Sequence, residues 1–486
     1  MSYQVPQNID THKVFLVNFS ELEGRLDPSI YRPQFKFISN KYRNVKLSEI
    51  AWVDPICDFG KAKEVSFVPM DAIDSVNGNI AYRGVKKVDE TKGFTRFKEG
   101  DILWAKITPC MQNAKSAIAK NLLNGYGCGS TEFFVIRTKD NNVVLQEYLL
   151  FLLRDERILK SAMNYFGGSA GQQRVSPLFL KTFSVPLPNI EEQNRFCELV
   201  RIAQKTKQQK DLQAEALLCG IDDYLLGVLG IELPKTESPT LQDRIFAVHF
   251  REICNGRFDP KLYSITVKQL KQSLYMSPFD KQPLKNFIKS SCSGEWGKDE
   301  SEEVDENKYA KCLVIRATEF DNTYNLQLDN SRVKYRWIEN SKLSKMNIQT
   351  NDLLIEKSGG SEDQPVGRIS ILTDEILEGN QIAYSNFIHK ITVNGINPMY
   401  LYFYLKTMYN IKITDSMQSQ TNGIRNLIMQ EYFDQTVVIP PLQKQQEIVD
   451  HILAIRQQAK ALQEEGKAIL EQAKREVERM IIGNKV

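Results

Sequence analysis

The sequence has no long hydrophobic segment of the kind that membrane or secreted proteins carry. No apolar run among its 486 residues reaches the ~18 residues that a membrane-spanning helix needs. The N-terminal segment MSYQVPQNIDTHK includes no apolar stretch like that of a secretory signal. We therefore expect a cytoplasmic protein that makes no contact with a membrane.

Paired cysteines and clustered histidines are also absent. The eight cysteines form no CxxC pair, a pattern typical of reduced thiols and not of a disulfide scaffold or a zinc site. The four histidines are far apart, at positions 12, 249, 389 and 451. Their spacing fits neither a metal site nor a nucleophile with its base. We expect this chain to hold no metal and no cofactor, and to have no catalytic site of its own.

An excess of charge of one sign is missing as well. The chain has 63 Lys and Arg residues against 60 Asp and Glu residues, a formal net charge of +3. A basic face for a nucleic acid is therefore permitted by the composition but not required by it. The hydrophobic content of 42% is that of an ordinary globular protein. The length predicts two or three domains, since a typical domain has ~100–200 residues.

The sequence does contain an internal repeat. Residues 14–28, VFLVNFSELEGRLDP, closely match residues 245–260, IFAVHFREICNGRFDP, apart from one inserted residue. The match continues as far as Tyr31 in the first copy and Tyr263 in the second. A repeat of this size indicates that one structural unit is used twice.

The far ends of the two copies also match, whereas their centres differ. FSVPLPNIEEQNRF (183–196) parallels QTVVIPPLQKQQEI (435–448). The matched pairs near these ends are Gly171 and Gly423, Pro188 and Pro440, and Gln193 and Gln445. The central segments 99–110 and 350–361 share little beyond a strand entry. Matched ends with divergent centres predict two modules that do the same job on different targets. The alternative is a duplicated scaffold whose centres have merely drifted.

Each copy has the pattern of an α/β module. A short opening strand, containing Leu16 or Val248, is followed by an Arg-x-Asp-Pro turn. Strand-like runs then alternate with Gly and Asn turns. A helix is predicted over 145–165 in the first copy and over 398–413 in the second. A loop rich in Gly, Ser, Gln and Arg follows in each copy, at 167–174 and at 416–425, and leads into a last strand.

Two long helices are predicted after the proline motifs, over 190–218 and 442–482, which contain no proline. The second has a heptad seam made of Ile452, Ile455, Ala459, Leu462, Gly466, Ile469 and Ala473. The weaker seam of the first consists of Phe196, Val200, Ala203, Ala214 and Leu217. Two similar helices from a duplicated unit would most simply pair antiparallel about a pseudo-two-fold axis. The alternative is that each helix packs on its own domain.

The predicted fold is therefore a mixed α/β fold with a pseudo-two-fold internal repeat. Two globular domains are separated by two long antiparallel helices. The predicted division is a first domain at 1–188, a first helix at 189–232, a linker at 233–244, a second domain at 245–440 and a second helix at 441–486.

Together these features resemble the specificity subunits of type I restriction–modification systems. The resemblance is carried by the GRLDP and GRFDP openings and by the VPLPNIEEQ and VIPPLQKQQ endings, each of which enters a long helix. It covers essentially the whole chain. The family pattern at the helix entry is Pro-Pro-Leu-x-Glu-Gln, and this sequence departs from it slightly in both copies, with Pro-Asn-Ile-Glu-Glu-Gln and Pro-Pro-Leu-Gln-Lys-Gln.

The resemblance implies two target recognition domains that each read one half of a bipartite site in double-stranded DNA. It implies that the paired helices set the spacer between the halves. The expected partners are two modification subunits, which are adenine methyltransferases that use S-adenosylmethionine, and restriction/translocase subunits that use ATP and Mg²⁺. Whether the complex restricts, only methylates or serves another defence role stays open.

DNA reading requires Lys and Arg for phosphates, and Arg, Lys, Asn, Gln or Ser for base edges. The candidate contacts in the first copy are Lys61, Lys63, Arg83, Lys106, Lys115, Gln172, Gln173 and Arg174. Those in the second copy are Arg332, Lys334, Arg336, Lys357, Arg368, Gln420, Asn422 and Arg425. The two loops with Gln and Arg are the strongest candidates, because both copies place them at the same position. Any single cation could equally be a solvated surface charge.

A self-contained DNA adenine methyltransferase is the main alternative. The segment from Gly125 to Gly129 superficially resembles a cofactor-binding glycine loop, but the strand-like run after it favours a hairpin turn. The segment from Asn397 to Tyr400 resembles an altered Asn-Pro-Pro-Tyr motif, but proline is favoured at the first position of a helix, so we interpret it as a helix start. A coiled-coil scaffold without DNA specificity is a third possibility, and it leaves the two divergent modules unexplained.

Overall fold

The computed structural model describes residues 16–17, 38–168, 172–234, 245, 247–253, 259–321, 326–328, 333–361, 364–421 and 424–483. The features predicted above that lie outside these residues are the Arg-x-Asp-Pro turn of the first copy, Tyr31, Gly171, Arg332, Asn422 and Gly423. The chain divides into two compact units. The first unit consists of residues 1–211 and 463–486, and the second unit consists of residues 212–462.

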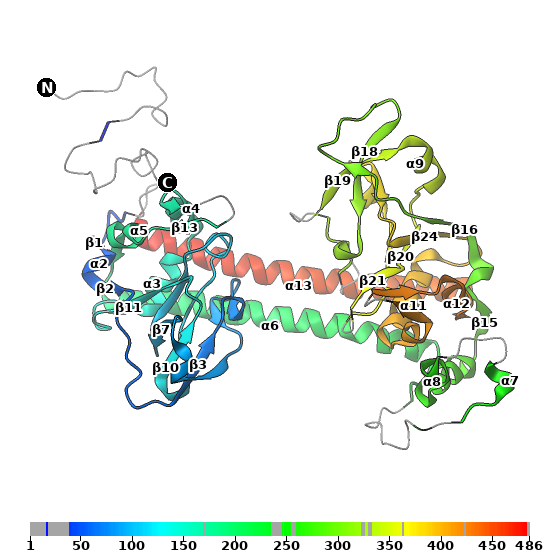
Figure 1. Ribbon diagram of the computed structural model, residues 1–486, viewed down its shortest axis with the longest axis horizontal. Coiled ribbons are helices and arrows are strands. Elements are labelled where there is room, and N and C mark those ends of the chain that lie inside the picture. The colour runs from blue at the N-terminus through cyan, green and yellow to red at the C-terminus, as the bar shows by residue number, and fades with distance from the viewer. Residues whose placement is uncertain are drawn as a thin grey trace. The chain divides into compact units, whose positions relative to one another are not determined.

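Two four-stranded sheets form the centre of the first unit (Figure 1). Their strand orders are β2-β11-β8-β9 and β6-β3-β10-β7. The strands of the first sheet are β2 (Ala51–Val53), β11 (Phe133–Thr138), β8 (Ile102–Ala105) and β9 (Ser116–Ile118). Those of the second are β6 (Gly84–Lys87), β3 (Glu64–Val68), β10 (Tyr126–Gly129) and β7 (Thr95–Lys98). All four residues of β8 are buried, so both faces of this strand are covered.

The second unit has a corresponding pair of sheets, with strand orders β16-β24-β20-β22 and β17-β19-β18-β23, which match the first pair except that the second sheet of each unit has one edge strand that the other unit lacks. The strands of the first of these are β16 (Ile288–Ser293), β24 (Ile388–Val393), β20 (Leu353–Glu356) and β22 (Ile369–Ile371). Those of the other are β17 (Lys298–Asp299), β19 (Lys334–Glu339), β18 (Tyr309–Ile315) and β23 (Ile382–Tyr384). The parallel pair β18–β23 corresponds to the parallel pair β3–β10 of the first unit. This shared topology confirms the predicted internal repeat.

A buried aspartate occupies the same place in both units, just before the fully buried strand. Asp101 and Asp352 each accept a hydrogen bond of 2.8 Å from the backbone N–H three residues earlier. Each also pairs at 2.7 Å with a cation from the neighbouring strand, Arg137 of β11 in the first unit and Lys390 of β24 in the second. The Asp101 carboxylate raises the pKa of Arg137. The two ion pairs tie equivalent strands together.

The short helices differ from the prediction in one respect. The helix predicted over 145–165 is two helices, α3 (Gln146–Leu153) and α4 (Glu156–Met163). The break occurs because Asp155 caps α4 by accepting a 2.9 Å hydrogen bond from the backbone N–H of Arg157. The helix predicted over 398–413 is α11 (Pro398–Asn410). The described residues of the predicted opening strands, Leu16 and Val248, belong to no strand.

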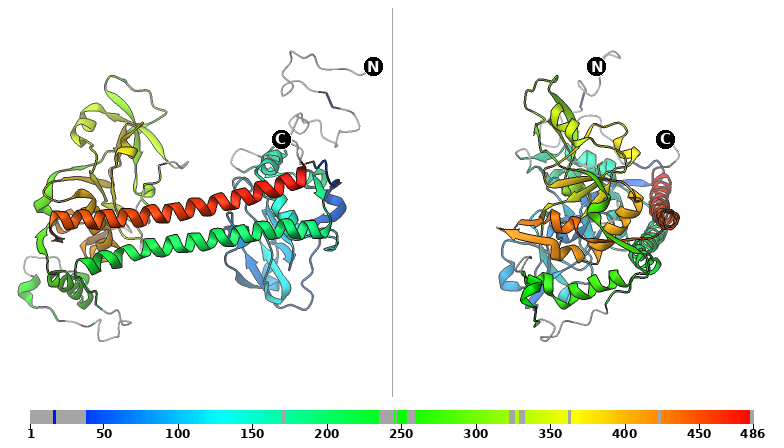
Figure 2. Two further views of the ribbon diagram at one scale, coloured as in Figure 1. Left: turned by 180° about the vertical axis from the view of Figure 1, so that it is seen from behind. Right: turned by 90° about the vertical axis from the view of Figure 1, so that its right-hand side faces the viewer.

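The two long helices are present, as α6 (Ile190–Val228) and α13 (Leu442–Ile482). Each begins in one unit and ends in the other. Within each unit the two helices lie side by side and run antiparallel (Figure 2). In the first unit Lys210 of α6 pairs with Glu465 of α13 at 2.8 Å. In the second unit the rings of Tyr224 and His451 lie 4.1 Å apart, farther along α6 and nearer the start of α13.

The predicted seams lie on the buried faces of these helices. Every predicted seam residue of both helices is buried or half-buried. Ile452 and Ala459 of α13 are 0% and 1% exposed, and Ala214 of α6 is 0% exposed. Helix α6 extends ten residues beyond its predicted end at 218, through the apolar residues Ile221, Leu225 and Leu226. The small residues on the seam allow the helix backbones to approach closely.

The matched glutamines explain why each long helix begins where it does. Gln193 donates hydrogen bonds to the carbonyls of Pro188 (2.8 Å) and Val143 (3.0 Å), and its own carbonyl accepts from the N–H of Leu145 (2.9 Å). Gln445 donates to the carbonyl of Pro440 (2.8 Å) and accepts from the N–H of Asn397 (2.9 Å). Both side chains are buried. They therefore anchor the start of each long helix to the loop before α3 or α11.

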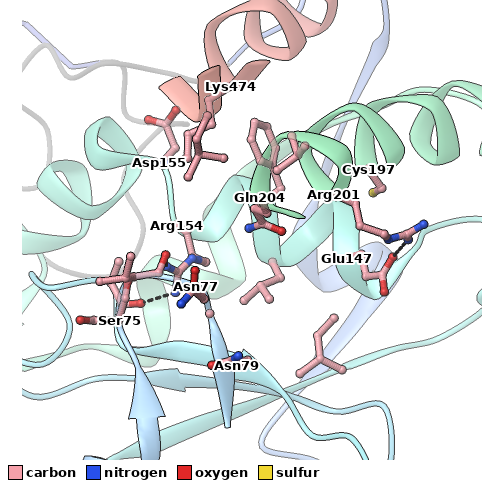
Figure 3. A pocket seen from close by; sticks show the side chains of 18 of the residues that line it. Ser75, Asn77, Asn79, Glu147, Arg154, Asp155, Cys197, Arg201, Gln204 and Lys474 are labelled. Atoms are coloured by element: carbon pink, nitrogen blue, oxygen red, sulfur yellow. Dashed lines mark hydrogen bonds and ion pairs between the residues drawn. The ribbon is translucent and has the colours of Figure 1, made fainter. Parts of the chain in front are cut away.

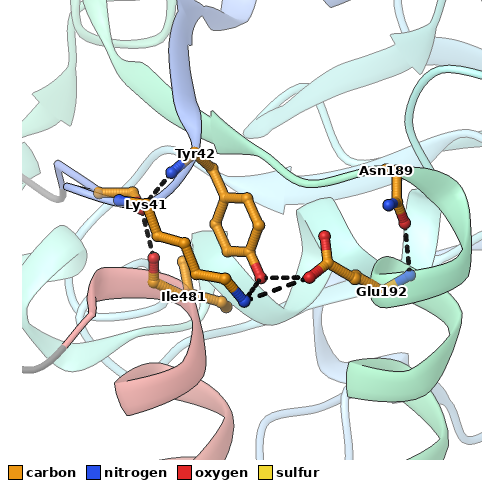
Figure 4. A network of polar contacts seen from close by, with 6 residues as sticks. Lys41, Tyr42, Asn189, Glu192 and Ile481 are labelled. Carbon is orange, nitrogen blue, oxygen red and sulfur yellow. Dashed lines mark hydrogen bonds and ion pairs between the residues drawn. The ribbon is translucent and has the colours of Figure 1, made fainter.

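A polar network joins the start of α6 to the segment before strand β1 (Arg43–Lys46) (Figure 4). The hydroxyl of Tyr42 donates to Glu192 at 2.7 Å, and the ammonium of Lys41 lies 3.2 Å from the same carboxylate. These contacts lower the pKa of Glu192, while burial is the largest cause of the raised pKa of Tyr42. The carbonyl of Ile481, at the end of α13, accepts from the hydroxyl of Ser39. The start of α6 and the end of α13 thus meet one short segment of the first unit.

No helix in the described part of the chain is long and apolar enough to cross a bilayer. The described cysteines, which exclude Cys254, are all free thiols.

Candidate nucleic-acid interface

Each unit has a lysine at the end of its fully buried strand, and the Gln/Arg loop of the same unit pairs with that lysine's backbone. Lys106 follows β8 and Lys357 follows β20. The carbonyl of Lys106 accepts from the N–H of Val175 at 2.9 Å, and the carbonyl of Lys357 accepts from the N–H of Leu427 at 2.7 Å. These bonds make Val175 of strand β13 (Arg174–Val175) the counterpart of Leu427 of strand β26 (Ile424–Leu427). Arg174 therefore corresponds to Asn426, and Arg425 lies one residue before that position.

In the first unit this site is organised by an ion pair. The guanidinium of Arg174 donates two hydrogen bonds to Glu132, from Nε at 2.9 Å and from Nη2 at 2.7 Å. These bonds lower the pKa of Glu132 and keep its carboxylate ionised. Arg174 also donates to the carbonyl of Gln172 at 3.1 Å, and the carbonyl of Gln173 accepts from Thr108 at 3.0 Å. The arginine side chain remains 43% exposed, so it can still reach a ligand.

In the second unit the site has different neighbours. The ammonium of Lys357 donates to the hydroxyl of Ser293 at 3.0 Å, and that hydroxyl lies 3.1 Å from Nδ1 of His389. Burial and, to a smaller extent, the charge of Lys357 together lower the pKa of His389 to about 4, so the imidazole is neutral at pH 7. Ser358 of strand β21 (Ser358–Gly360) donates to Asn426 at 2.7 Å. The site therefore offers hydroxyl and amide groups beside its cations.

The lysine environments of the two units differ because one position of the repeat, on the neighbouring strand, holds a different residue in each unit. The backbone N–H of Lys106 donates to Glu132, and that of Lys357 donates to Phe387, both at the start of the neighbouring strand. Counting along those two strands from these bonds shows that Phe134 of the first unit corresponds to His389 of the second. The ammonium of Lys106 lies 5.2 Å from the ring centroid of Phe134, a cation–π contact. The same lysine is thus held by an aromatic ring in one unit and by a serine–histidine pair in the other.

Three other predicted contacts of the first unit lie beside strands of its second sheet, and a fourth, Lys115, lies beside a strand of its first sheet. Lys61 and Lys63 precede β3, Arg83 precedes β6, and all three are exposed. Lys115, at the start of β9, is half-buried and donates to the carbonyl of Met70 at 3.1 Å. These four residues are not brought together with Lys106 and Arg174 by any hydrogen bond of the described residues.

Two predicted contacts of the second unit are already engaged. Arg368 is 7% exposed and forms a buried ion pair with Glu356 at 2.8 Å. Its remaining donors bond the carbonyls of Phe320 (3.0 Å) and Ala317 (2.9 Å). Arg336, which is 13% exposed, donates to the carbonyl of Trp296 at 2.8 Å and to Asp299 at 3.2 Å. The burial of Arg368 argues against its predicted role as a DNA contact. All its hydrogen-bond partners are protein groups, and those bonds would have to break before the guanidinium could reach DNA.

The remaining predicted contacts have less structural description. Lys334 is exposed at the start of β19. The backbone of Gln420 pairs with Arg425 between strand β25 (Gln418–Thr421) and β26, and its side chain is not described. Arg332 and Asn422 lie outside the described residues. Sequence reasoning missed Glu132, Ser293, His389 and Asn426. The recurrence of a lysine just after the shared strand entry, at Lys106 and Lys357, was the signal that could have directed attention to their neighbours.

A cavity of about 1290 Å³ lies in the first unit between α3, α4, α6 and α13 (Figure 3). Most of its charged groups have partners in the wall: Lys120 and Arg201 with Glu147, Arg157 with Asp155 and Glu478, and Lys474 with Glu471. The buried guanidinium of Arg154 bonds the carbonyls of Ser75 (2.6 Å) and Ala114 (2.7 Å). The cavity is therefore a polar junction between the sheets and the long helices of this unit.

The two methyltransferase-like motifs are structural. The hairpin turn was predicted for the segment from Gly125 to Gly129. Only Gly125 lies in a turn, at φ +75°, and Tyr126–Gly129 form strand β10. A Cβ on Gly127 would lie 2.3 Å from the ring of Phe97, which explains the glycine by close packing. Asn397 caps α11 by accepting from the N–H of Met399, and Tyr400 is fully buried. The segment is therefore a helix start, as predicted. Among the described residues no group of three or more His, Cys, Asp or Glu side chains could hold a metal ion.

Comparison with known proteins agrees with the repeat. The family model for the type I restriction modification DNA specificity domain matches twice, over residues 40–224 and 292–472. These two matches span well over half of the chain and divide between the two copies. The chain belongs to the family of type I restriction modification DNA specificity proteins.

Two curated relatives are specificity subunits of type I restriction enzymes from Escherichia coli. The EcoAI subunit is 37% identical over 169 residues, which are 34% of this chain and 28% of the relative. The EcoEI subunit is 37% identical over 171 residues, which are 34% of this chain and 29% of the relative. The match thus spans less than a third of either relative. A chain from a structural study of complex assembly in the type I R-M system is 16% identical, with a TM-score of 0.49 over 90% of this chain and 96% of that chain.

Proposed function

We propose that this chain is the DNA-sequence specificity subunit of a type I restriction–modification complex. Its two units act as target recognition domains that each read one half of a bipartite site in double-stranded DNA. The chain itself is non-catalytic and directs its partners to the site. The matched relatives are specificity subunits of type I restriction enzymes, and the specificity domain occurs twice in this chain.

The observation that carries the proposal is the equivalent placement of Lys106 and Lys357, each of which pairs with the Gln/Arg loop of its own unit, where Arg174 or Arg425 lies. Each lysine lies where a fully buried strand ends and the Gln/Arg loop returns. A rigid strand holds the lysine, and cations at such a site suit phosphate contacts or the O6 and N7 atoms of guanine. The neighbours differ between the units, which is what two unlike half-sites require. We therefore propose Lys106, Gln172, Gln173 and Arg174 as one DNA contact set, and Lys357, Gln420, Asn422 and Arg425 as the other.

The cations Lys61, Lys63, Arg83, Lys115, Arg332 and Lys334 are proposed as secondary phosphate contacts. Phosphate contacts fix the position of a protein on DNA and contribute affinity that depends on salt, but they carry no base sequence. The predicted domain division at 1–188, 189–232, 233–244, 245–440 and 441–486 remains part of this proposal.

The proposed partners are two modification subunits, which supply S-adenosylmethionine-dependent adenine methylation, and restriction/translocase subunits that use ATP and Mg²⁺. These cofactors would be bound by the partners and not by this chain. We propose that the assembly works in the cytoplasm. A complex that only methylates, or one with another defence role, would use the same subunit.

Methylome sequencing of the host with and without the gene tests the proposal. We expect one bipartite adenine-methylation motif to disappear when the gene is deleted. Exchange of residues 36–182 for those of a relative should then change one half of that motif and leave the other half intact. An unchanged methylome would reject the proposed function, and a change in both halves would reject the assignment of one half to each unit.

A further inference from the structure

The second unit contains an acidic segment beside its DNA-reading sheets. Six of the eight residues in 299–306, DESEEVDE, are Asp or Glu, and all eight except Val304 are exposed. The segment begins in β17, which adds an edge strand beyond β19. In the first unit the corresponding strand, β6, is itself the edge of its sheet. The acidic strand is thus an addition to the repeated topology.

The carboxylates of this strand are bonded to cations of the adjacent strands. Asp299 lies directly opposite Arg336 in the β17–β19 register, and the two side chains pair at 3.2 Å. Glu300 pairs with Lys311 of β18 at 2.6 Å. The guanidinium of Arg336 also stacks on the ring of Trp296, 4.3 Å from its centroid. Glu300 is therefore bonded to a lysine that is 46% exposed. Asp299 is bonded to Nη1 of Arg336, whose Nε and Nη2 bond the carbonyls of Trp296 and Gly297.

The equivalent strand of the first unit shows what such a surface is like without the acidic addition. Lys87 of β6 and Arg83 just before it are exposed. Lys86 stacks on the rings of Phe67 and Phe94, at 4.9 Å and 5.2 Å from their centroids. Basic side chains next to aromatic rings at a sheet edge are suited to a nucleic-acid backbone. The first unit therefore ends this sheet with a basic strand, and the second unit adds an acidic strand beyond the equivalent one.

We propose that the β17 strand is an intramolecular substitute for the DNA backbone. Asp299 and Glu300 take the place of phosphate oxygens on Arg336 and Lys311, and so keep this face of the second unit from binding DNA of any sequence. Non-specific affinity for DNA is almost entirely electrostatic. Two cations that lie away from the reading site contribute mainly to non-specific binding. Masking them therefore weakens non-specific binding more than target binding and raises the ratio of target affinity to non-specific affinity. The inference rests on the proposed DNA-reading function.

The test is the affinity of the full-length chain for a short duplex without the target, measured by fluorescence anisotropy over a series of salt concentrations. The variant Asp299→Asn/Glu300→Gln should bind several-fold more tightly at low salt. Its plot of log K against log salt should steepen by about 1–2, because each new phosphate contact contributes ~0.9 to the slope. The gain should vanish when Arg336→Gln and Lys311→Gln are added, since the released cations are its cause.

The matched control is Glu303→Gln/Glu306→Gln, which removes the same charge from the same segment and leaves both ion pairs in place. An equal gain in this control would overturn the inference, because net charge and not release of the cations would then explain the result. An unchanged affinity of Asp299→Asn/Glu300→Gln would overturn it as well. If the double variant melts at a lower temperature than the wild type, the single variant Glu300→Gln takes its place in the test. It releases only Lys311 and should give about half of the change in the salt slope. Failure of the wild-type chain to prefer the target duplex would instead reject the proposed function.

Discussion

At the scale of single residues, the two units use equivalent positions for different chemistry. Asp101 and Asp352 occupy one position and have one role, the anchoring of a buried strand. Phe134 and His389 also occupy one position, but one offers an aromatic face to a lysine and the other a neutral imidazole to a serine. Residues that hold the fold are therefore repeated, whereas residues beside the exposed cations differ.

His389 should make the stability of the second unit depend on pH. Its folded pKa of about 4 lies below the ordinary value of 6.5, because burial and Lys357 disfavour the charged imidazole. Between these values the unfolded chain binds a proton that the folded chain does not, so stability falls as the pH drops from about 6.5 to 4. His389→Phe introduces the residue type found at the corresponding position of the first unit, Phe134. This substitution should reduce the acid-induced loss in the free energy of unfolding by up to about 2–3 kcal/mol. Urea unfolding near pH 7 and pH 5 measures this difference in the free energy of unfolding.

The control is His451→Gln, at an exposed position. If the stability of His389→Phe fell with pH as much as that of the wild type, the assignment of this pH dependence to His389 would be contradicted.

Lys390 should be indispensable to the packing of the second unit. Its ammonium is 2% exposed and Asp352 is 0% exposed, so removal of the cation leaves a buried carboxylate without its charge partner. Lys390→Met should cost about 3–5 kcal/mol, and much of this should return in Lys390→Met/Asp352→Asn. Hydrogen exchange of peptides from β20 and β24 reports the change locally. Additive costs in the double variant would show that the two groups do not interact.

At the scale of elements, the long helices depend on small residues where they touch and on glutamines where they begin. Gly466 of α13 faces α6 in the first unit, where an added Cβ would lie 3.3 Å from the Cα of Lys207. Gly220 of α6 has nothing within 4 Å of such a Cβ. The two glycines therefore differ in purpose, although both interrupt helices of high polar content.

The glycines provide a paired prediction about helix packing. Gly466→Leu should destabilise the first unit by about 1–3 kcal/mol, because the larger side chain forces the helices apart. Gly220→Ala should instead stabilise by up to about 1 kcal/mol, since alanine favours the helix and meets no neighbour. Thermal unfolding of the full-length chain distinguishes the two. Stabilisation by both substitutions would mean that α6 and α13 are not in contact at Gly466.

The buried glutamines provide a second prediction at this scale. Gln193→Ala removes three hydrogen bonds and leaves the carbonyl of Val143 and the N–H of Leu145 without this partner. A loss of about 2–4 kcal/mol is expected, because each buried group left unpaired costs about 1–3 kcal/mol. Gln209→Ala, at an exposed position of the same helix, should change stability by less than about 0.5 kcal/mol. Equal effects in urea unfolding would remove the anchoring role from Gln193.

At the scale of the whole molecule, the chain is a repeat whose first unit consists of two separate segments of the sequence. The first unit needs the end of α13 as well as residues 1–211, and the second unit needs parts of both long helices. A change in one unit's reading site can therefore leave the other site intact while both share the same two helices. This separation makes the half-site assignment testable.

Substitution of the proposed reading-site cations of one unit should affect one half-site. Lys106→Gln/Arg174→Gln and Lys357→Gln/Arg425→Gln should each weaken target binding and lower the salt slope by up to about 2, given ~0.9 per phosphate contact. Methylome sequencing should show relaxed recognition in one half of the motif for the first pair and in the other half for the second. Loss of the same half in both variants would contradict the proposed pairing of units with half-sites.

Much of the architecture was open to prediction from the sequence because it rests on local or repeated patterns. The matched proline and glutamine motifs predicted where the long helices begin, and the heptad spacing predicted which of their residues would be buried, since a helix turns by the same angle at every residue. The repeat predicted the shared topology. It also directed attention to the Gln/Arg loops, because both copies place them at one offset.

Which cations are exposed was decided only by the tertiary structure. Arg368 and Arg336 look like any other surface basic residue in the sequence, yet Glu356 encloses one and the β17 strand covers the other. The break at Asp155, the strand pairing of Gly127 and the serine–histidine support of Lys357 also depend on which segments meet in space. Periodicity and repetition are properties of neighbouring residues and can be seen in the sequence. Burial and charge pairing are set by contacts between distant residues and exist only once the chain has folded.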